Sequence, residues 1–188
     1  MPPKIKTSTE DIIKAAFELV REQGYSALNA RSLAARLGCS VQPLFRAFEN
    51  MEDLKEAVLE RVKEYYSNYL RDSMNLEDGL VGLEMAYIRF AKEEKHLFQW
   101  LHMSDRYALK ATGDFSNLGI NREIVEMMAQ MTGLSFEASR KLYEGCFFTA
   151  HGMATMLATN HCELREDNIR EIMDSVFYGL VMKLKSEV

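Results

Sequence analysis

Residues Ala30 to Glu49, ARSLAARLGCSVQPLFRAFE, decide the fold of this chain, because they predict two short helices joined by one sharp turn. Two helices that cross steeply through a three- or four-residue turn need a small residue where they touch, and Ala34 supplies it. Gly38, four residues later, can take up the positive φ that such a turn requires. The stretch predicts a helix-turn-helix, and an ordinary helical hairpin is the alternative that the same residues allow.

The residues around the turn fit this motif. Asn29 is placed to cap the first helix and Ser40 the second, while Pro43 stands in the first turn of the second helix, where a missing N–H costs little. The inward positions hold apolar side chains four residues apart, namely Leu33 and Leu37, then Leu44 and Phe48. We therefore expect both helices to pack on a third one.

Charge in this stretch favours a nucleic-acid partner. From Gln23 to Phe48 the sequence contains no Asp or Glu, but it contains Arg31, Arg36 and Arg46. The net charge of the chain is −5, yet residues 1–65 hold ten basic and ten acidic residues, so the deficit lies in the remainder. An acid-free basic stretch is typical of a surface that binds phosphates.

The composition excludes several classes of protein. With 188 residues, 47% hydrophobic and 27% charged, the chain is long enough for one core or two small domains and is neither disordered nor membrane-like. The longest uncharged run, residues 145–162, contains Thr, His and Asn, which indicates a buried helix. The first residues, MPPKIKTS, lack an apolar secretion segment, and the three cysteines are unclustered. We expect a cytoplasmic protein.

Helices are also predicted on both sides of the motif. After a basic arm with Lys4 and Lys6, a capping box at Thr7 or Ser8 begins a helix over residues 11–23, which Gly24 ends. Residues 50–53 begin a longer helix that runs to about residue 71. The chain is thus predicted to be all-α, with a three-helix DNA-binding domain over residues 1–50 and a helical ligand-binding and dimerisation domain over residues 51–188.

In this order of parts, the chain resembles the TetR family of transcriptional repressors over about residues 8–60. The resemblance rests on the helix 11–23, Gly24-Tyr25, the Ala34 and Gly38 motif, and LFRAFENMEDL leading into a long helix. Phe45 stands where the family usually has a Tyr whose hydroxyl reaches phosphate, and Met51 where it usually has a Lys. The resemblance therefore implies that two positioning contacts to DNA are missing.

The residues expected to contact DNA surround the turn and are Arg31, Ser32, Ser40, Val41, Gln42, Pro43, Phe45 and Arg46. The start of a recognition helix points into the major groove, where Gln can pair with adenine and Arg with guanine. Arg46 is equally interpreted as a phosphate contact or a solvated residue. Phe45 either contacts a thymine methyl or sugar or packs within its domain.

The second domain is rich in Met and aromatic residues, which suits an adaptable cavity for a small molecule. The predicted ligand-binding residues are Tyr65, Tyr69, Tyr87, Phe90, Phe98, Trp100, Leu101, Met127, Met128, Phe147, Phe148 and His151. Such residues at helical spacing also form ordinary cores, so the alternative is that they only stabilise the domain. His151 either orients a polar group of the ligand or is a satisfied core histidine.

The last two predicted helices, residues 136–160 and 166 onward, carry long apolar stripes. Gly145 and Gly152 permit close approach of another helix, and an isologous dimer would bury the stripes in a four-helix bundle. The predicted interface residues are Leu142, Cys146, Thr149, Met153, Met156, Ile172, Met173, Val176, Phe177, Leu180, Val181 and Leu184. The alternative is that these stripes form the domain's own core.

The sequence offers no reactive constellation. His96 and His102 are six residues apart, and His161-Cys162-Glu163 has no second ligand pair, so no metal, cofactor or catalytic site is predicted. The function predicted instead is that of a homodimeric repressor that binds a palindromic DNA operator and responds to a small apolar or amphipathic effector. The alternative is a helical small-molecule-binding or adaptor protein in which the motif is only structural.

Overall fold

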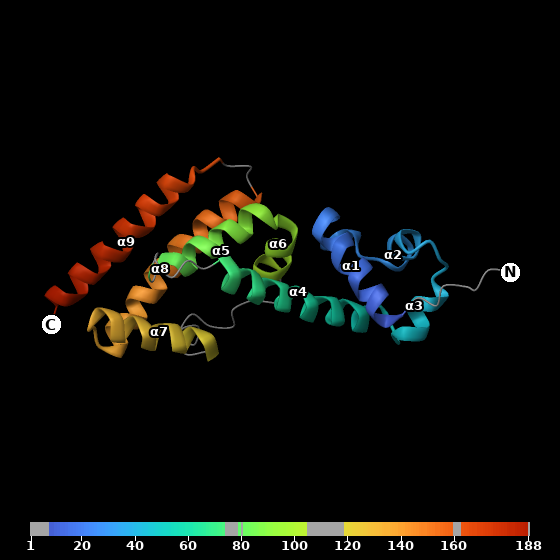
Figure 1. Cartoon of the computed structure of the whole chain (residues 1–188), viewed down its shortest axis with the longest axis horizontal. Helices are drawn as coiled ribbons and strands as arrows, with labels where there is room; N and C mark the ends of the chain where they lie inside the picture. The colour runs from blue at the N-terminus through green and yellow to red at the C-terminus, as the bar shows by residue number, and fades with distance from the viewer. Residues whose placement is uncertain (1–7, 74–78, 80, 105–118, 160–162, 188) are drawn as a thin grey trace.

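The computed structural model describes residues 8–73, 79, 81–104, 119–159 and 163–187, and the regular structure in these ranges is helical. Figure 1 shows an elongated molecule with α1, α2 and α3 at one end, α5 to α9 at the other, and α4 running between them. The predicted all-α fold is confirmed. Predictions made for Lys4, Lys6, His161 and Cys162 lie outside the described residues.

Helix α1 (Thr9–Gln23) begins with the predicted capping box at Ser8. The Ser8 hydroxyl accepts the Asp11 N–H at 3.1 Å, and the Asp11 carboxylate accepts the Ser8 N–H at 2.9 Å. The helix ends at Gly24, whose φ of +83° and ψ of 166° are a combination that glycine almost alone adopts. A Cβ at Gly24 would lie 3.3 Å from Nδ1 of His96, so this glycine also permits close approach.

Helices α2 (Ala30–Arg36) and α3 (Gln42–Ala47) form the predicted motif. The Asn29 side chain caps α2 by accepting the N–H groups of Arg31 and Ser32 at 3.1 and 3.0 Å. Gly38 turns the chain with a φ of +63°. The predicted cap at Ser40 is wrong, because α3 begins one residue later with Val41 at the N-cap and without a side-chain hydrogen bond.

Helix α4 (Met51–Ser73) is shared by both ends of the molecule. Asn50 caps it by accepting the N–H groups of Glu52 and Asp53 at 2.8 and 3.0 Å. It packs against both α1 and α5, with Leu54 and Val58 buried near its start and Tyr66 and Tyr69 in contact with Phe90 of α5 further along. The domain boundary predicted between residues 50 and 51 coincides with the start of α4 and stays a prediction.

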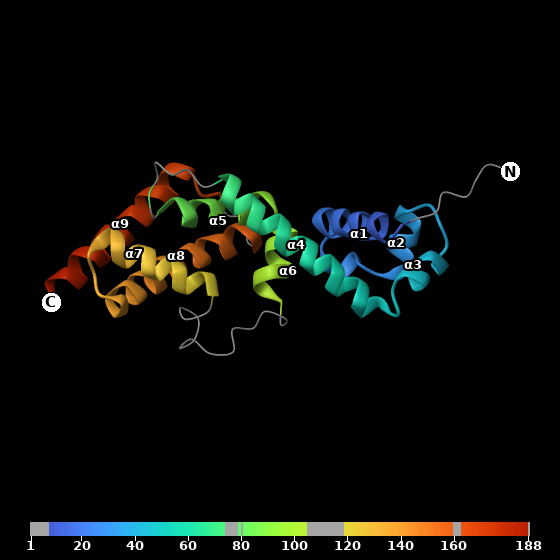
Figure 2. The same ribbon diagram turned by 60° about the horizontal axis from the view of Figure 1, so that its bottom comes forward.

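The second body consists of α5 (Val81–Glu93), α6 (Lys95–Met103), α7 (Gly119–Thr132), α8 (Phe136–Thr159) and α9 (Glu166–Ser186). Helix α8 packs against all of the other four, and Figure 2 shows α4 passing between this group and the first body. Gly145 brings α8 close to α9, because a Cβ there would lie 2.5 Å from Cδ1 of Leu180. Within the ranges described above, no helix is both long and apolar enough to cross a membrane.

Candidate functional site

The outward face of α3 carries most of the residues predicted to contact DNA. Leu44 faces inward and is fully buried, whereas Gln42 and Arg46 are exposed and Phe45 keeps 48% of its surface. Exposure is also high at Ser40, Val41 and Arg31, while Ser32 and Pro43 are half-buried. All eight predicted residues therefore lie on α2, on α3 or in the turn between them, with side-chain surface available to a partner.

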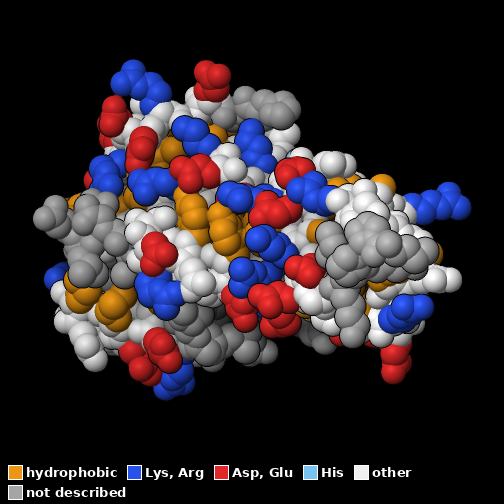
Figure 3. All heavy atoms as spheres, turned by 45° about the vertical axis from the view of Figure 1, so that its right-hand side comes forward, with side chains coloured by type: hydrophobic (Ala, Val, Ile, Leu, Met, Phe, Trp, Pro, Cys, Tyr) orange, Lys and Arg blue, Asp and Glu red, His pale blue; other side chains and the backbone are white. Residues whose placement is uncertain are grey.

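Arg36 has a different role from the other arginines of the motif. Its guanidinium donates two hydrogen bonds of 2.7 Å to the carboxylate of Glu22, which joins α2 to α1. This pairing raises the pKa of Arg36 and lowers the pKa of Glu22. The basic surface expected from the sequence is correspondingly weaker, and Figure 3 shows positive and negative side chains interspersed over the visible face.

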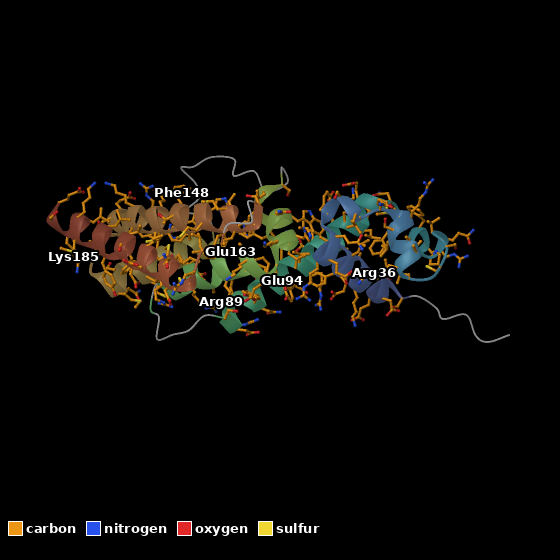
Figure 4. All side chains as sticks on the ribbon, turned by 90° about the horizontal axis from the view of Figure 1, so that it is seen from above. Arg36, Arg89, Glu94, Phe148, Glu163 and Lys185 are labelled. Atoms are coloured by element: carbon orange, nitrogen blue, oxygen red, sulfur yellow. The ribbon has the colours of Figure 1, made fainter. Side chains whose placement is uncertain are left out.

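A cluster of polar side chains joins the first body to the second. Nε of Arg21 on α1 donates to both carboxylate oxygens of Glu94 at 3.0 and 2.8 Å, and Glu94 precedes α6 with only 7% of its surface exposed. The hydroxyl of Tyr65 on α4 donates to the same carboxylate at 2.7 Å. We call Arg21, Tyr65 and Glu94 the junction cluster; Figure 4 labels Glu94 between the two bodies.

The junction cluster shifts the pKa values of two of its members, and an aromatic contact lies beside it. The hydrogen bond to Glu94 raises the pKa of Arg21 above its usual range. Burial, followed by the hydrogen bond to Glu94, raises the pKa of Tyr65 to about 12. Beside the cluster, Trp100 of α6 packs against Tyr25, with ring centroids 4.8 Å apart. The first body is therefore attached to α6 directly, as well as through α4.

A group of aromatic rings fills the space between α4, α5, α6 and α8. Its centre is Tyr87 on α5, whose ring lies 5.5 Å from Phe98, 5.2 Å from His102 and 5.9 Å from Phe147. Around it lie the rings of Tyr66, Phe90, Tyr143 and His151. We call these eight residues the aromatic core; edge-to-face and tilted ring pairs of this kind stabilise the packing of the four helices.

Polar atoms inside this region are incompletely paired. The Tyr87 hydroxyl and His151 Nδ1 form a hydrogen bond of 2.8 Å, but His102 Nε2, Glu84 Oε2 and Ser139 Oγ have no hydrogen-bond partner among the described residues. Burial, followed by the effect of His151, lowers the pKa of His102 to about 4, so its imidazole is neutral at pH 7. Burial raises the pKa of Glu84 to about 7.

The structure divides the residues predicted to bind a ligand. Tyr87, Phe90, Phe98, Phe147 and His151 lie together in the aromatic core, and Tyr69 contacts it through Phe90. Tyr65 and Phe148 lie at its edge, with rings 6.5 Å from Phe90 and 5.8 Å from Phe147, although Tyr65 belongs to the junction cluster and Phe148 is 50% exposed. The others lie elsewhere: Trp100 beside the junction cluster, Leu101 and Met128 buried in their helices, and Met127 exposed by 43%.

Three members of the aromatic core are absent from the predicted ligand-binding set, namely Tyr66, His102 and Tyr143. His102 follows Phe98 by four residues and Tyr143 precedes Phe147 by four, so each shares a helix face with a predicted residue. That spacing is the signal that identifies these two residues. A groove of about 90 Å³ between α5 and α9, lined by Met85, Arg89 and Glu166 among others, contains none of the predicted residues.

The predicted interface residues on α8 and α9 also fall into two groups. Six of them are buried in the protomer's own core: Leu142, Cys146, Met153, Met173, Phe177 and Leu184. Met156 and Ile172 are exposed by 45% and 42%, and Thr149, Val176, Leu180 and Val181 are half-buried. Additional exposed apolar side chains on these helices are Phe148, Tyr178 and Met182.

The first body, with its capped α1, its steep α2 and α3 turn and the start of α4, corresponds to a known family. The family described as bacterial regulatory proteins, tetR family, matches residues 12–58, which extend from α1 into α4. The chain belongs to the tetR family. It is accordingly a DNA-binding transcriptional regulator, and proteins of the tetR family are regulators and not enzymes. None of the curated proteins compared with the chain matches it.

Proposed function

We propose that this tetR family protein is a homodimeric repressor that binds a palindromic operator through α2 and α3 and is released by a small apolar or amphipathic effector. The observation that carries the proposal is the exposed outer face of α3, on which Gln42, Phe45 and Arg46 stand free of the protomer core. In a dimer, two such helices would contact half-sites roughly 34–36 Å apart, one turn of DNA.

The aromatic core supports an effector site in the domain that follows residue 50. Its rings come from α4, α5, α6 and α8, so a molecule inserted among them would displace helices that contact the first body. Helix α4, the junction cluster and the contact of Trp100 with Tyr25 connect these helices to the first body, so the displacement would reach it through them. An effector acts only if it prefers the conformation that fits DNA poorly, typically by roughly 1–3 kcal/mol.

The outer sides of α8 and α9 support the proposed dimer. Phe148, Gly152 and Met156 are spaced four apart on α8, and on α9 Ile172 and Gly179 are similarly exposed. Nothing in the described protomer lies within 4 Å of a Cβ built at Gly152 or Gly179, so both leave room for a partner helix. The proposed contact surface therefore consists of these residues, supported from behind by the buried stripe of Leu142, Met173 and Phe177.

Replacing Gln42 with Ala is expected to weaken operator binding about tenfold while leaving the fold intact. Gln42 is exposed, and the loss of one side chain that forms hydrogen bonds to a base typically costs about 1–3 kcal/mol of discrimination against the wrong base. The measurement is a gel-shift titration with a DNA duplex selected by the wild-type protein from a random library. Unchanged affinity would remove Gln42 from the reading residues.

Replacing Met156 with Glu is expected to raise the dissociation constant of the dimer at least tenfold, because it places an unpaired charge in an apolar interface. Met131 on α7 is exposed by 61% and provides the matched control, since its replacement with Glu leaves α8 and α9 untouched. Sedimentation over a range of concentrations measures both variants. Equal dissociation constants for the two variants would place the interface elsewhere.

The alternative, an adaptor protein with a merely structural motif, makes a different prediction for DNA. Selection from a random duplex library followed by gel shifts at several salt concentrations separates the two. A repressor enriches a palindromic site, with an affinity that falls as salt rises because phosphate contacts release counterions. Failure to retard any duplex at low salt would reject the proposed function.

A further inference from the structure

The outward face of α3 is divided into two rows of different chemistry. Val41 and Phe45 are four residues apart, with 37% and 48% of their surfaces exposed. Gln42 and Arg46, each one position later, are also four apart and exposed. Residues four apart lie one above the other on a helix, so an apolar row runs beside a polar row.

We infer that the apolar row of Val41 and Phe45 reads the C5-methyl groups of thymines in each operator half-site. This inference rests on the proposed function, namely that α3 enters the major groove. There a thymine presents its methyl group, while the adenine of the same pair presents the N6 and N7 atoms that a Gln side chain recognises. An apolar row next to Gln42 therefore matches a site in which A·T pairs present both features together.

Packing within the protomer does not account for the apolar row. The inward side of α3 is already filled by Leu44, which is fully buried, and Phe48 packs against the core behind it. Phe45 lacks a hydroxyl and so has only apolar surface with which to contact a partner. Arg31 on α2 and Arg46 on α3 are both exposed, and their charge favours a negatively charged partner. Thymine-containing DNA is such a partner, and its methyl groups are apolar.

The test removes the thymine methyl group and nothing else. A duplex selected by the wild-type protein is prepared with deoxyuridine in place of one thymine at a time, which keeps every hydrogen-bonding group of the base. At one or more positions in the half-site the wild-type protein is expected to bind about fourfold more weakly, which is the effect of exposing one methyl-sized group. Substitution at a thymine outside the protected site serves as the control.

The variants Phe45→Ala and Val41→Ala identify the side chain responsible. At the position read by Phe45, the Phe45→Ala protein is expected to bind thymine and deoxyuridine duplexes equally, while Val41→Ala retains the difference there. Both side chains are partly exposed, so circular dichroism should give unchanged helix content and melting temperature. A variant that melts early is replaced by Phe45→Leu, which keeps apolar surface but shortens its reach.

Several outcomes would overturn the inference. Wild-type affinity that is the same with and without every methyl group would do so, as would a methyl effect that persists in both alanine variants. A uniform loss in Phe45→Ala, independent of methyl groups, would instead assign Phe45 to the sugar-phosphate backbone or to a protein partner. If the wild-type protein selects no duplex, the proposed function itself fails, and this result is distinct from the others.

Discussion

Arg21→Ala is expected to lower the free energy of unfolding by about 2–3 kcal/mol, one of the two largest effects predicted for this protein. The variant leaves the Glu94 carboxylate, which is 7% exposed, with Tyr65 as its remaining partner in the junction cluster. The expected loss of unfolding free energy is smaller than for a fully buried ion pair, because Arg21 is 39% exposed and water can partly replace its guanidinium. Urea denaturation followed by circular dichroism measures the change.

Two controls separate the junction cluster from ordinary surface charge. Arg61 on α4 is 60% exposed and pairs with Glu64, so Arg61→Ala is expected to change the unfolding free energy by less than about 0.5 kcal/mol. Adding Glu94→Gln to Arg21→Ala removes the unpaired charge and should recover part of the loss. If Arg21→Ala and Arg61→Ala are equally mild, the junction cluster does not hold the two bodies together.

Glu84→Gln is expected to stabilise the protein by about 3 kcal/mol at pH 8 and to have almost no effect at pH 4. Burial raises the pKa of Glu84 from 4.5 to about 7, so folding favours the protonated form. The contribution of this group is fully present below pH 4.5, is lost as the pH rises towards about 7, and stays lost above it. Glutamine remains neutral throughout and escapes this loss.

The measurement is the unfolding free energy of both proteins at several pH values between 4 and 8. Glu123→Gln, which changes an exposed carboxylate on α7, is the matched control for replacing a carboxylate by an amide. The difference between wild type and Glu84→Gln should grow across the interval from pH 4.5 to about 7. A flat difference over that interval would mean that Glu84 has a partner in solution.

The first body could be predicted from sequence because its features are local. Ser8 with Asp11, Asn29, Ala34 and Gly38 each satisfy a requirement set by neighbours a few residues away, and the structure has these residues where the pattern placed them. The predicted cap at Ser40 is displaced by one residue because the carbonyl of Val41, at the N-cap position, accepts the first hydrogen bonds of α3, from the N–H groups of Leu44 and Phe45. The start of a short helix depends on such details of the turn.

The effector site and the interface depend on contacts that are distant in the sequence. The sequence predicted Trp100 and Phe98 together as residues that either bind a ligand or pack in the core, but it did not show that Trp100 faces Tyr25 while Phe98 faces Tyr87. Likewise Phe177 and Ile172 belong to one apolar stripe, yet only Phe177 is buried by its own protomer. Periodicity identifies a buried face, and the packing partner of that face comes only from the three-dimensional arrangement.

Trp100 is the single tryptophan of the chain, and from α6 it packs against Tyr25 of the first body. The protein thus contains its own optical probe at the joint between its two bodies. Its emission should respond when the first body moves away from α6, and should stay constant when a compound binds without moving it. Screening compounds by this intrinsic signal requires neither an added label nor knowledge of the operator.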